Sequence, residues 1–447
     1  MRKFASVALV LLLLPLAARA QTRALSLDEA IAAGLEASPA LHASRMKAES
    51  STAKAREVAA GRLPSLRLGA GYTRLSEVPP FQVTLPISPN PIVVSQSYFN
   101  NWNMRLSVQQ PLFTGFRLEA GTESARMLEK SAGLDLEKDR SEFVFAVKSA
   151  YWGLARAREI ETVVGETIRQ VQEHLKDVRA FFDQGLLTKN EVLRAELQLS
   201  NATLMAIDAR NAVEMARTSL NSLLGLPVET EVELTTSAES LASRAQASGE
   251  AGKDAAAARS FVDAALAGRP EIKSADFRIK ASEAGLKAAK SGWYPQVSLA
   301  GNYYYLRPNS RFLPALDKFK GTWDIGVAIS FDLWNWGQTK SQMEQARAQL
   351  GQAQDARKLL EDQAVLDVTQ SRLALAQARD KVKVAGEAVG QADENLRMIR
   401  EQFRQGVALN ADVLDAEVFL LQAKTARTQA AIDLVLAQAR LEKALGN

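Results

Sequence analysis

Two acidic residues near the C-terminus have a spacing that suggests a joint role. Asp412 and Asp415 stand three positions apart in a stretch predicted to be helical, so both carboxylates face one side of the helix. Near the start of a helix, such acids stabilise the helix dipole. Repeated around a symmetry axis, they would instead form stacked rings of negative charge that favour cations. The stretch itself is compatible with both roles.

The side chains that catalytic sites require are scarce. The sequence has no cysteine, and its two histidines, His42 and His174, lie far apart in the chain. It has no nucleophile set, phosphate-binding glycine loop or zinc-ligand spacing. We therefore expect neither an enzyme nor a bound cofactor or metal.

Residues 1–20 have the pattern of a secretory signal peptide. Arg2 and Lys3 precede an apolar run that ends in an Ala-Arg-Ala cleavage site. We predict that the mature chain begins near Gln21, and it then has no cysteine for a lipid anchor. The formal net charge of the full sequence is +4, and without a long basic block it does not indicate a nucleic-acid partner.

An internal repeat runs through most of the chain. The stretch FFDQGLLTKNEVLRAELQLSNA, at 181–202, returns as QFRQGVALNADVLDAEVFLLQA, at 402–423. Gly185 and Gly406 occupy matching positions in the two stretches. Each is predicted to follow the end of a long helix, in the left-handed conformation that glycine adopts without strain.

The residues after each glycine have the pattern of a second helix start. Thr188 and Glu191 are predicted to form a capping box, and Asn410 to cap the matching helix. Leu193 and Leu414 are interpreted as core residues between paired helices.

The duplication divides the mature chain into two repeats with the order helix, strand, strand, helix, helix. They differ in length within 76–101, a proline-rich stretch that we expect to be a surface loop. We predict repeat 1 over 21–225, a linker over 226–257 and repeat 2 over 258–447. Strands are predicted at 65–75, 102–112, 296–306 and 323–333, long helices at 116–184 and 338–404, and shorter helices at 27–61 and 189–224.

The predicted strands alternate between apolar and polar side chains. In the first strand, Leu66 and Leu68 face away from Ser65 and Arg67. Their length, about ten residues, suits a tilted strand that crosses a bilayer. A half-buried sheet in a soluble protein alternates equally well, so the pattern leaves both open. Aromatic residues at or beside the strand ends favour the membrane: Trp102, Trp293, Tyr294, Trp323, Trp334 and Trp336.

The long helices and the number of strands also favour a membrane channel. A run of nearly seventy residues without proline reaches about 100 Å as a helix, longer than a small soluble sheet needs. Four strands cannot close a barrel, and lipid does not tolerate an open edge. Two chains would give a barrel filled by its own side chains, whereas three would leave a wet interior. That interior would be lined by Arg67, Asn103, Arg105, Gln109 and Asp324.

These features together resemble the TolC-type outer-membrane efflux channels. The resemblance covers essentially the whole mature chain, and it rests on the duplicated plan and on three motifs: QPLFTGFRLEA at 110–120, QGLLTKNEVLRAE and QGVALNADVLDAE. It implies a mostly helical fold with transmembrane strands. In this fold a homotrimer forms a twelve-stranded β-barrel in the outer-membrane lipid, and a long α-helical barrel continues it through the periplasm.

The resemblance also implies a function. Such a channel is the exit duct of a tripartite pump, and it exports small molecules passively. It is gated at the periplasmic tip and works with a periplasmic adaptor protein and an inner-membrane pump of the RND, ABC or MFS type. Two alternatives remain: the exit duct of a type I protein secretion system, and a periplasmic coiled-coil scaffold protein.

Positions that match the family's motifs give the candidate sites. The resemblance implies a periplasmic gate formed by Asp412, Asp415, Glu191 and Phe403. It implies an adaptor-docking surface formed by Gly185, Leu186, Leu193, Ala195, Gly406, Val407, Leu414 and Ala416.

The gate departs from the family pattern at two positions. Phe403 replaces a tyrosine, and Ala408 replaces a basic residue. Glu191 therefore lacks both groups that the resemblance implies as partners for the acid at this position, the tyrosine hydroxyl and the basic side chain. We expect closure by a different contact, an ion pair or an aromatic one: Lys189 with Asp412, or Phe182 with Phe403.

Overall fold

The structure, a computed structural model, divides into two compact units. Unit 1 comprises Met1–His42, Asp139–Arg269 and Ala364–Asn447, and unit 2 comprises Ala43–Lys138 and Pro270–Gln363. Each unit therefore contains residues of both predicted repeats. The predicted signal peptide and part of the predicted linker lie outside the described residues, which are 23–84, 86–87, 90–237, 242, 255–313 and 315–446.

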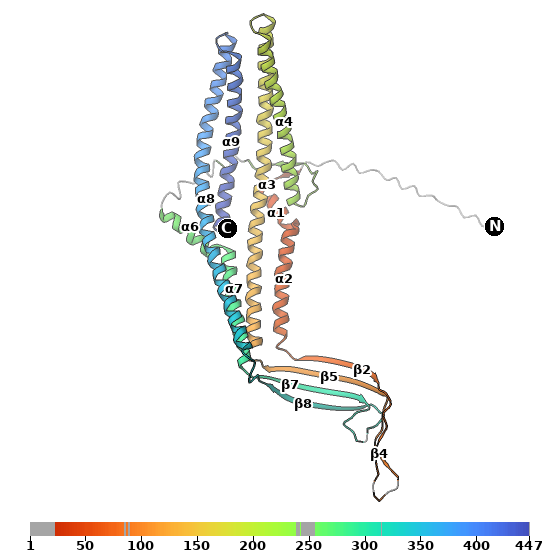
Figure 1. The fold of residues 1–447 in the computed structure, drawn as a ribbon. Coiled ribbons are helices and arrows are strands. Elements are labelled where there is room, and N and C mark those ends of the chain that lie inside the picture. The colour runs from red at the N-terminus through yellow and green to blue at the C-terminus, as the bar shows by residue number, and fades with distance from the viewer. Residues whose placement is uncertain are drawn as a thin grey trace, which may run out of the picture. The chain divides into compact units, whose positions relative to one another are not determined.

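Two helices of 67 residues dominate the chain, α3 (Arg117–Asp183) and α8 (Gln338–Arg404). Neither contains a proline, so nothing interrupts their backbone hydrogen bonds. Each is followed by a helix of 35 residues, α4 (Lys189–Leu223) and α9 (Asn410–Ala444) respectively. In unit 1, α3 and α4 form one helical hairpin, and α8 and α9 form another (Figure 1).

The first helix of each repeat is broken, which corrects the single helix predicted over 27–61. The structure has α1 (Leu27–Ala37) and α2 (Pro39–Ala60), and later α6 (Ala255–Gly268) and α7 (Pro270–Ala289). Ser38 takes an extended conformation with ψ 116°, because a proline ring disfavours helical geometry in the residue before it.

The predicted linker contains a strand. In unit 1, β1 (Arg23–Leu25) pairs in parallel with β6 (Val232–Leu234). Leu25 and Val232 are buried in a core that includes Tyr151 and Trp152 of α3. The Tyr151 hydroxyl donates a hydrogen bond to the Leu25 carbonyl at 3.1 Å. The residues of the linker at 232–234 are thus part of the packed body of unit 1.

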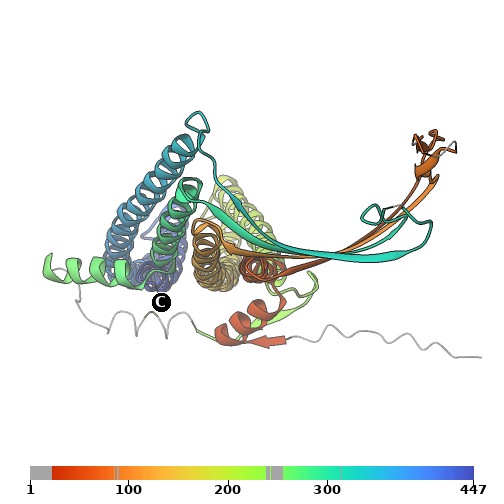
Figure 2. The ribbon, with the colours of Figure 1, turned by 90° about the horizontal axis from the view of Figure 1, so that it is seen from below.

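Unit 2 contains a curved antiparallel sheet of four strands (Figure 2). The strand order is β2-β5-β7-β8. The connection between β2 and β5 contains a short hairpin, β3 (Phe81–Val83) and β4 (Ile92–Ser95). The strand β8 lies three residues earlier than predicted. The four strands are β2 (Ser65–Arg74), β5 (Asn100–Phe113), β7 (Gln296–Arg307) and β8 (Lys320–Ser330).

The register sorts the side chains into one apolar face and one polar face, as the alternation predicts. Residues opposite one another in an antiparallel sheet point to the same face. The apolar face is uncovered, since Leu68 is 76% exposed and Trp323 is 69% exposed. One apolar row is Leu68, Leu106, Tyr303 and Trp323, and one polar row is Arg67, Ser107, Asn302 and Asp324.

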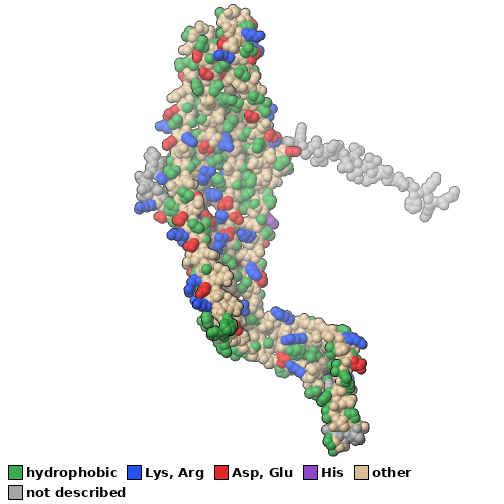
Figure 3. Space-filling view, viewed as in Figure 1, with side chains coloured by type: hydrophobic (Ala, Val, Ile, Leu, Met, Phe, Trp, Pro, Cys, Tyr) green, Lys and Arg blue, Asp and Glu red, His purple; other side chains and the backbone are tan. Residues whose placement is uncertain are grey.

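A second group of exposed apolar side chains lies where the strands of unit 2 join its helices (Figure 3). The rings of Trp334 and Trp336 meet edge to face at 5.9 Å between centroids, and Trp293 and Tyr294 precede β7. Phe116 contacts Tyr294 at 5.6 Å. This is the position expected for an aromatic girdle at a membrane surface. Within the described residues, none of the helices is both long and apolar enough to cross a membrane.

We predict opposite stability effects for alanine at corner glycines and at a helical glycine. Gly185 and Gly406 have φ of 77° and 76°, so an alanine at either should cost about 1–2 kcal/mol of stability. Gly386, exposed within α8, should gain up to about 1 kcal/mol as alanine. An added Cβ meets nothing within 4 Å at any of the three, which removes clashes as a cause. The midpoint of thermal unfolding in detergent measures the effect, and equal shifts at all three positions would contradict it.

Candidate functional site

The two helical corners have the same backbone geometry. After α3, the Leu186 N–H donates to the Phe181 carbonyl at 2.9 Å, around Gly185. After α8, the Val407 N–H donates to the Gln402 carbonyl at 2.9 Å. Both glycines are left-handed, and the bonds satisfy carbonyls that the helix end leaves free. The predicted left-handed conformation of both glycines at the helix ends is confirmed.

The predicted caps of the following helices are wrong. Thr188 is the N-cap residue of α4, but its side chain makes no capping hydrogen bond. The N-cap residue of α9 is Leu409 rather than Asn410. The Asp412 carboxylate accepts a hydrogen bond from the Leu409 N–H at 3.0 Å. Asp412 therefore stabilises the start of α9 and, like Asp415, remains exposed.

Asn410 instead joins the two hairpins. Its side chain is buried, and its Nδ2 donates to Glu191 Oε2 at 2.8 Å and to the Glu191 carbonyl at 3.2 Å. Its Oδ1 lies 2.7 Å from His174 Nε2. Because an amide oxygen only accepts, the histidine donates this bond. The link connects α9 with α3 and α4, and it explains why Glu191 is not available for the predicted capping box.

Phe403 belongs to the core beneath the corners rather than to their surface. It is 4% exposed, and its ring lies 5.1 Å from that of His174 and 5.5 Å from that of Phe181. The expected packing of Phe403 against Phe182 is wrong, because Phe181 makes the contact instead. Within the described part of a single chain, Asp412 also makes no ion pair with Lys189.

Burial shapes the electrostatics of this core. Loss of solvent lowers the pKa of His174 below 6.5, and nearby Arg400 acts in the same direction, while Asn410 and Asp177 oppose the shift. The folded state therefore favours the neutral form of His174. Arg400 also forms an ion pair of 2.7 Å with Glu417. Burial raises the pKa of Glu417, and the hydrogen bond from Arg400 opposes that rise.

The structure divides the predicted docking residues into two groups. Leu186 and Val407 are 68% and 74% exposed, and both corner glycines are exposed as well. Leu193 is also exposed, which contradicts its interpretation as a core residue within one chain. Leu414 is half-buried, and Ala195 and Ala416 lie in the core with Phe403. The buried alanines position the corners but offer no surface.

A hollow of about 650 Å³ lies between the two corners. Its apolar walls include Leu186, Leu187 and Leu409, and its charged groups include Arg194 and Arg404. The Asn410–Glu191 link lies in its lining. Separation of the hairpins would therefore break this link and change the shape of the hollow.

Comparisons with known proteins are consistent with this architecture. Residues 30–226 and 261–447 match the family described as outer membrane efflux protein. The chain belongs to this family. BepC of Brucella suis, an outer membrane efflux protein, is 24% identical over 351 residues, which are 78% of this chain and 73% of BepC. AprF of Pseudomonas aeruginosa, an alkaline protease secretion protein, is 23% identical over 77% of this chain and 69% of AprF.

The solved structures show the same fold. The outer membrane protein VceC of Vibrio cholerae aligns with a TM-score of 0.77 at 20% identity, over 94% of this chain and 96% of VceC. The predicted fold of the chain, mostly helical with a four-stranded sheet, is confirmed. The family match confirms the outer-membrane location, with extension into the periplasm, and the role in efflux as an exit duct. The family consists of channels rather than enzymes.

We predict that His174 makes stability depend on pH. Its pKa is lowered on folding, so the folded state favours the neutral ring, and stability should fall as pH drops below the unfolded value of 6.5. His174→Gln keeps a donor for Asn410 but does not titrate. The unfolding midpoint of the wild type should therefore decline between pH 7 and 5 relative to that of the variant, whereas parallel curves would refute the assignment. Glu417 titrates in both proteins, so its contribution cancels in the difference.

Proposed function

We propose that three copies of this chain form the outer-membrane exit channel of a tripartite efflux pump for small molecules. The single observation that supports it most is the uncovered apolar face of the sheet in unit 2. Leu68, Trp323 and Ile329 are at least two-thirds exposed on that face. Such a face is costly in water and favourable in lipid.

The edges of the sheet support the assembly with other copies. Within the described residues, β2 and β8 each pair with one strand only, so both expose unpaired backbone groups. Lipid cannot satisfy these groups, so neighbouring chains must. Three chains give twelve strands, which leave room for a water-filled pore lined by the polar face. We infer a homotrimer on this ground.

The corners would form the periplasmic gate. The bond from Asn410 to Glu191 ties the α8–α9 hairpin to the α3–α4 hairpin. Breaking this bond would free the hairpins to move apart. Asp412 and Asp415 are exposed at the same end, and in a trimer they would form carboxylate rings that favour cations. Phe403 would act from the core, by supporting His174 beneath Asn410.

The same end of the chain would bind a periplasmic adaptor protein. Gly185, Leu186, Gly406 and Val407 form an exposed surface of small and apolar residues, and the hollow between the corners adjoins it. Such a surface suits the tip of a helical hairpin, whose side chains can enter the hollow. The adaptor would connect the channel to an inner-membrane pump that supplies the energy, so the channel itself needs no catalytic step or cofactor.

Type I protein secretion remains a second candidate. It is favoured by the similarity to AprF, which is named for alkaline protease secretion. The identity of the bound adaptor and pump distinguishes the two. The scaffold alternative is abandoned, because the chain belongs to a family of outer-membrane proteins.

We predict that breaking the link between the hairpins opens the gate. Glu191→Ala and Asn410→Ala should raise single-channel conductance in planar bilayers, by roughly twofold or more, since the narrow end would widen. Glu191→Gln keeps an acceptor and should have a smaller effect. Glu196→Ala is the matched control, because Glu196 binds Arg179 within a single hairpin at 2.6 Å. An equal rise in conductance in the control would argue against a specific lock.

We predict that the corner surface captures the adaptor. In intact cells, a photoreactive side chain at Leu186 or Val407 should crosslink to a periplasmic protein that contains a helical hairpin. A photoreactive side chain at Leu313, exposed in the β7–β8 connection, should not. Leu186→Asp with Val407→Asp should reduce co-purification about tenfold or more, since each apolar contact contributes about 1.5 kcal/mol or more. Capture of the same protein from all three positions would contradict this surface.

A further inference from the structure

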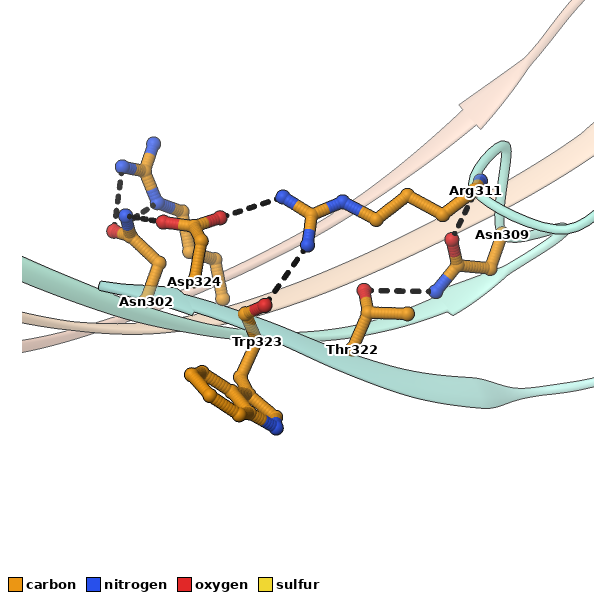
Figure 4. Close-up of polar contacts among 7 residues, drawn as sticks. Asn302, Asn309, Arg311, Thr322, Trp323 and Asp324 are labelled. Carbon is orange, nitrogen blue, oxygen red and sulfur yellow. Dashed lines mark hydrogen bonds and ion pairs between the residues drawn. The ribbon is translucent and has the colours of Figure 1, made fainter. Parts of the chain in front are cut away.

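A connected cluster of polar side chains lies on the polar face of the sheet. Asn302 Nδ2 donates to Asp324 Oδ1 at 2.7 Å, and Arg311 Nη2 donates to Asp324 Oδ2 at 2.6 Å (Figure 4). Arg105 donates twice to Asn302 Oδ1, from Nε at 3.1 Å and from Nη2 at 2.7 Å. The cluster thus joins β5, β7 and β8 with the connection that follows β7.

Arg311 is held in place by its own loop. It lies in the β7–β8 connection, yet its Nη1 reaches the Trp323 carbonyl at 2.9 Å. Asn309, which is buried, accepts from the Arg311 backbone N–H at 3.0 Å. Asn309 also donates to the Lys320 carbonyl at 3.0 Å. The loop is therefore folded onto the polar face, with Arg311 directed along it (Figure 4).

The ring of Tyr304 lies close to two guanidinium groups. The Arg105 carbon is 5.4 Å from the ring centroid, and the Arg311 carbon is 5.3 Å from it. Both distances lie within the range of cation–π attraction. The aromatic ring lets two like charges share this site while both remain open to solvent.

The cluster carries a net positive charge. Asp324 is the only acid at the polar-face positions of the four strands, and Arg311 neutralises it. Arg105 is bound by the neutral amide of Asn302, so its charge is not cancelled by this partner. The other charged residues at polar-face positions are Arg67 and Lys320, both basic.

We infer that the sheet end of the pore selects for anions, with Arg105 and Arg311 as the residues that determine this selectivity. The inference rests on the proposed trimer, in which the polar face lines the pore. Three copies would then place rings of guanidinium groups on the wall, and such rings attract anions and repel cations. The permeant class is small anions, organic carboxylates included.

The exposed carboxylates at the corners have the opposite sign to the arginines of the sheet. Asp412 and Asp415 belong to unit 1, whereas Arg105 and Arg311 belong to unit 2. Removal of the two corner carboxylates therefore allows the charges of the sheet to be tested by themselves.

The experiment measures reversal potentials of the full-length trimer in planar bilayers under a KCl gradient. With Asp412→Ala and Asp415→Ala present, we expect chloride to be more permeant than potassium. Arg105→Gln with Arg311→Gln should lower the chloride-to-potassium permeability ratio roughly twofold or more. Asp324→Asn should raise the ratio, because it removes the acid that balances Arg311. Tripolyphosphate added on the sheet side should block the pore, and less so in the double arginine variant.

A matched control is Arg74→Gln. Arg74 lies on β2 opposite Asn100, which puts it at an apolar-face position in line with Leu68 and Tyr72, so its loss should leave the ratio unchanged. A pore that forms but prefers potassium, or whose ratio ignores the Arg105 and Arg311 substitutions, overturns the inference while the exit-channel function stands. A purified protein that forms no trimer and no pore overturns the proposed function, and this inference with it.

Discussion

An apolar sheet face that none of the described residues of its own unit covers is the constraint on which the rest of this protein depends. The four strands of unit 2 present Leu68, Trp323 and their neighbours to the surroundings. In water, each such side chain would cost about 1.5–3 kcal/mol relative to a buried position. The chain therefore needs lipid against this face. It also needs neighbours at β2 and β8, because lipid offers no hydrogen bonds to an open strand edge.

The two hairpins of unit 1 meet through polar groups as well as apolar ones. The core beneath the corners is apolar around Phe403, but His174, Asn410 and Glu191 form a hydrogen-bonded chain through it. Hydrogen bonds of this kind are directional, so they specify how two hairpins are placed more sharply than apolar contacts do. Each contributes only about 1–3 kcal/mol net, the bond to the Glu191 carboxylate being the stronger. A contact that is directional but of modest strength can hold the two hairpins together and still be broken by a partner protein.

The charged groups that would line the proposed pore differ in sign between the corners and the sheet. The corners carry Asp412 and Asp415, whereas the polar face of the sheet carries Arg67, Arg105 and Lys320. In the proposed trimer, a solute would pass negative groups at the corners and positive groups on the sheet. Such a path would need no nucleotide-binding or catalytic groups, because the proposed pump would do the work and the channel would supply only a charged wall.

Local patterns in the sequence determined the strand faces, the long helices and the left-handed corners. Alternation, the absence of proline, and glycine at matching positions act through the backbone of neighbouring residues, so Leu68, Gly185 and Gly406 could be assigned without tertiary structure. The break at Ser38 has an equally local cause in Pro39.

Only the tertiary structure decided which distant groups meet. Asn410 contacts Glu191 and His174 across more than two hundred residues. No local pattern around Asn410 indicates these contacts rather than the helix-capping role that the sequence predicted. Phe403 is buried, although its position in the corner motif suggested a surface role. Likewise, Arg311 reaches Asp324 only because its loop folds back over the sheet. Such contacts depend on the packing of whole helices and strands, which the order of residues along the chain does not display.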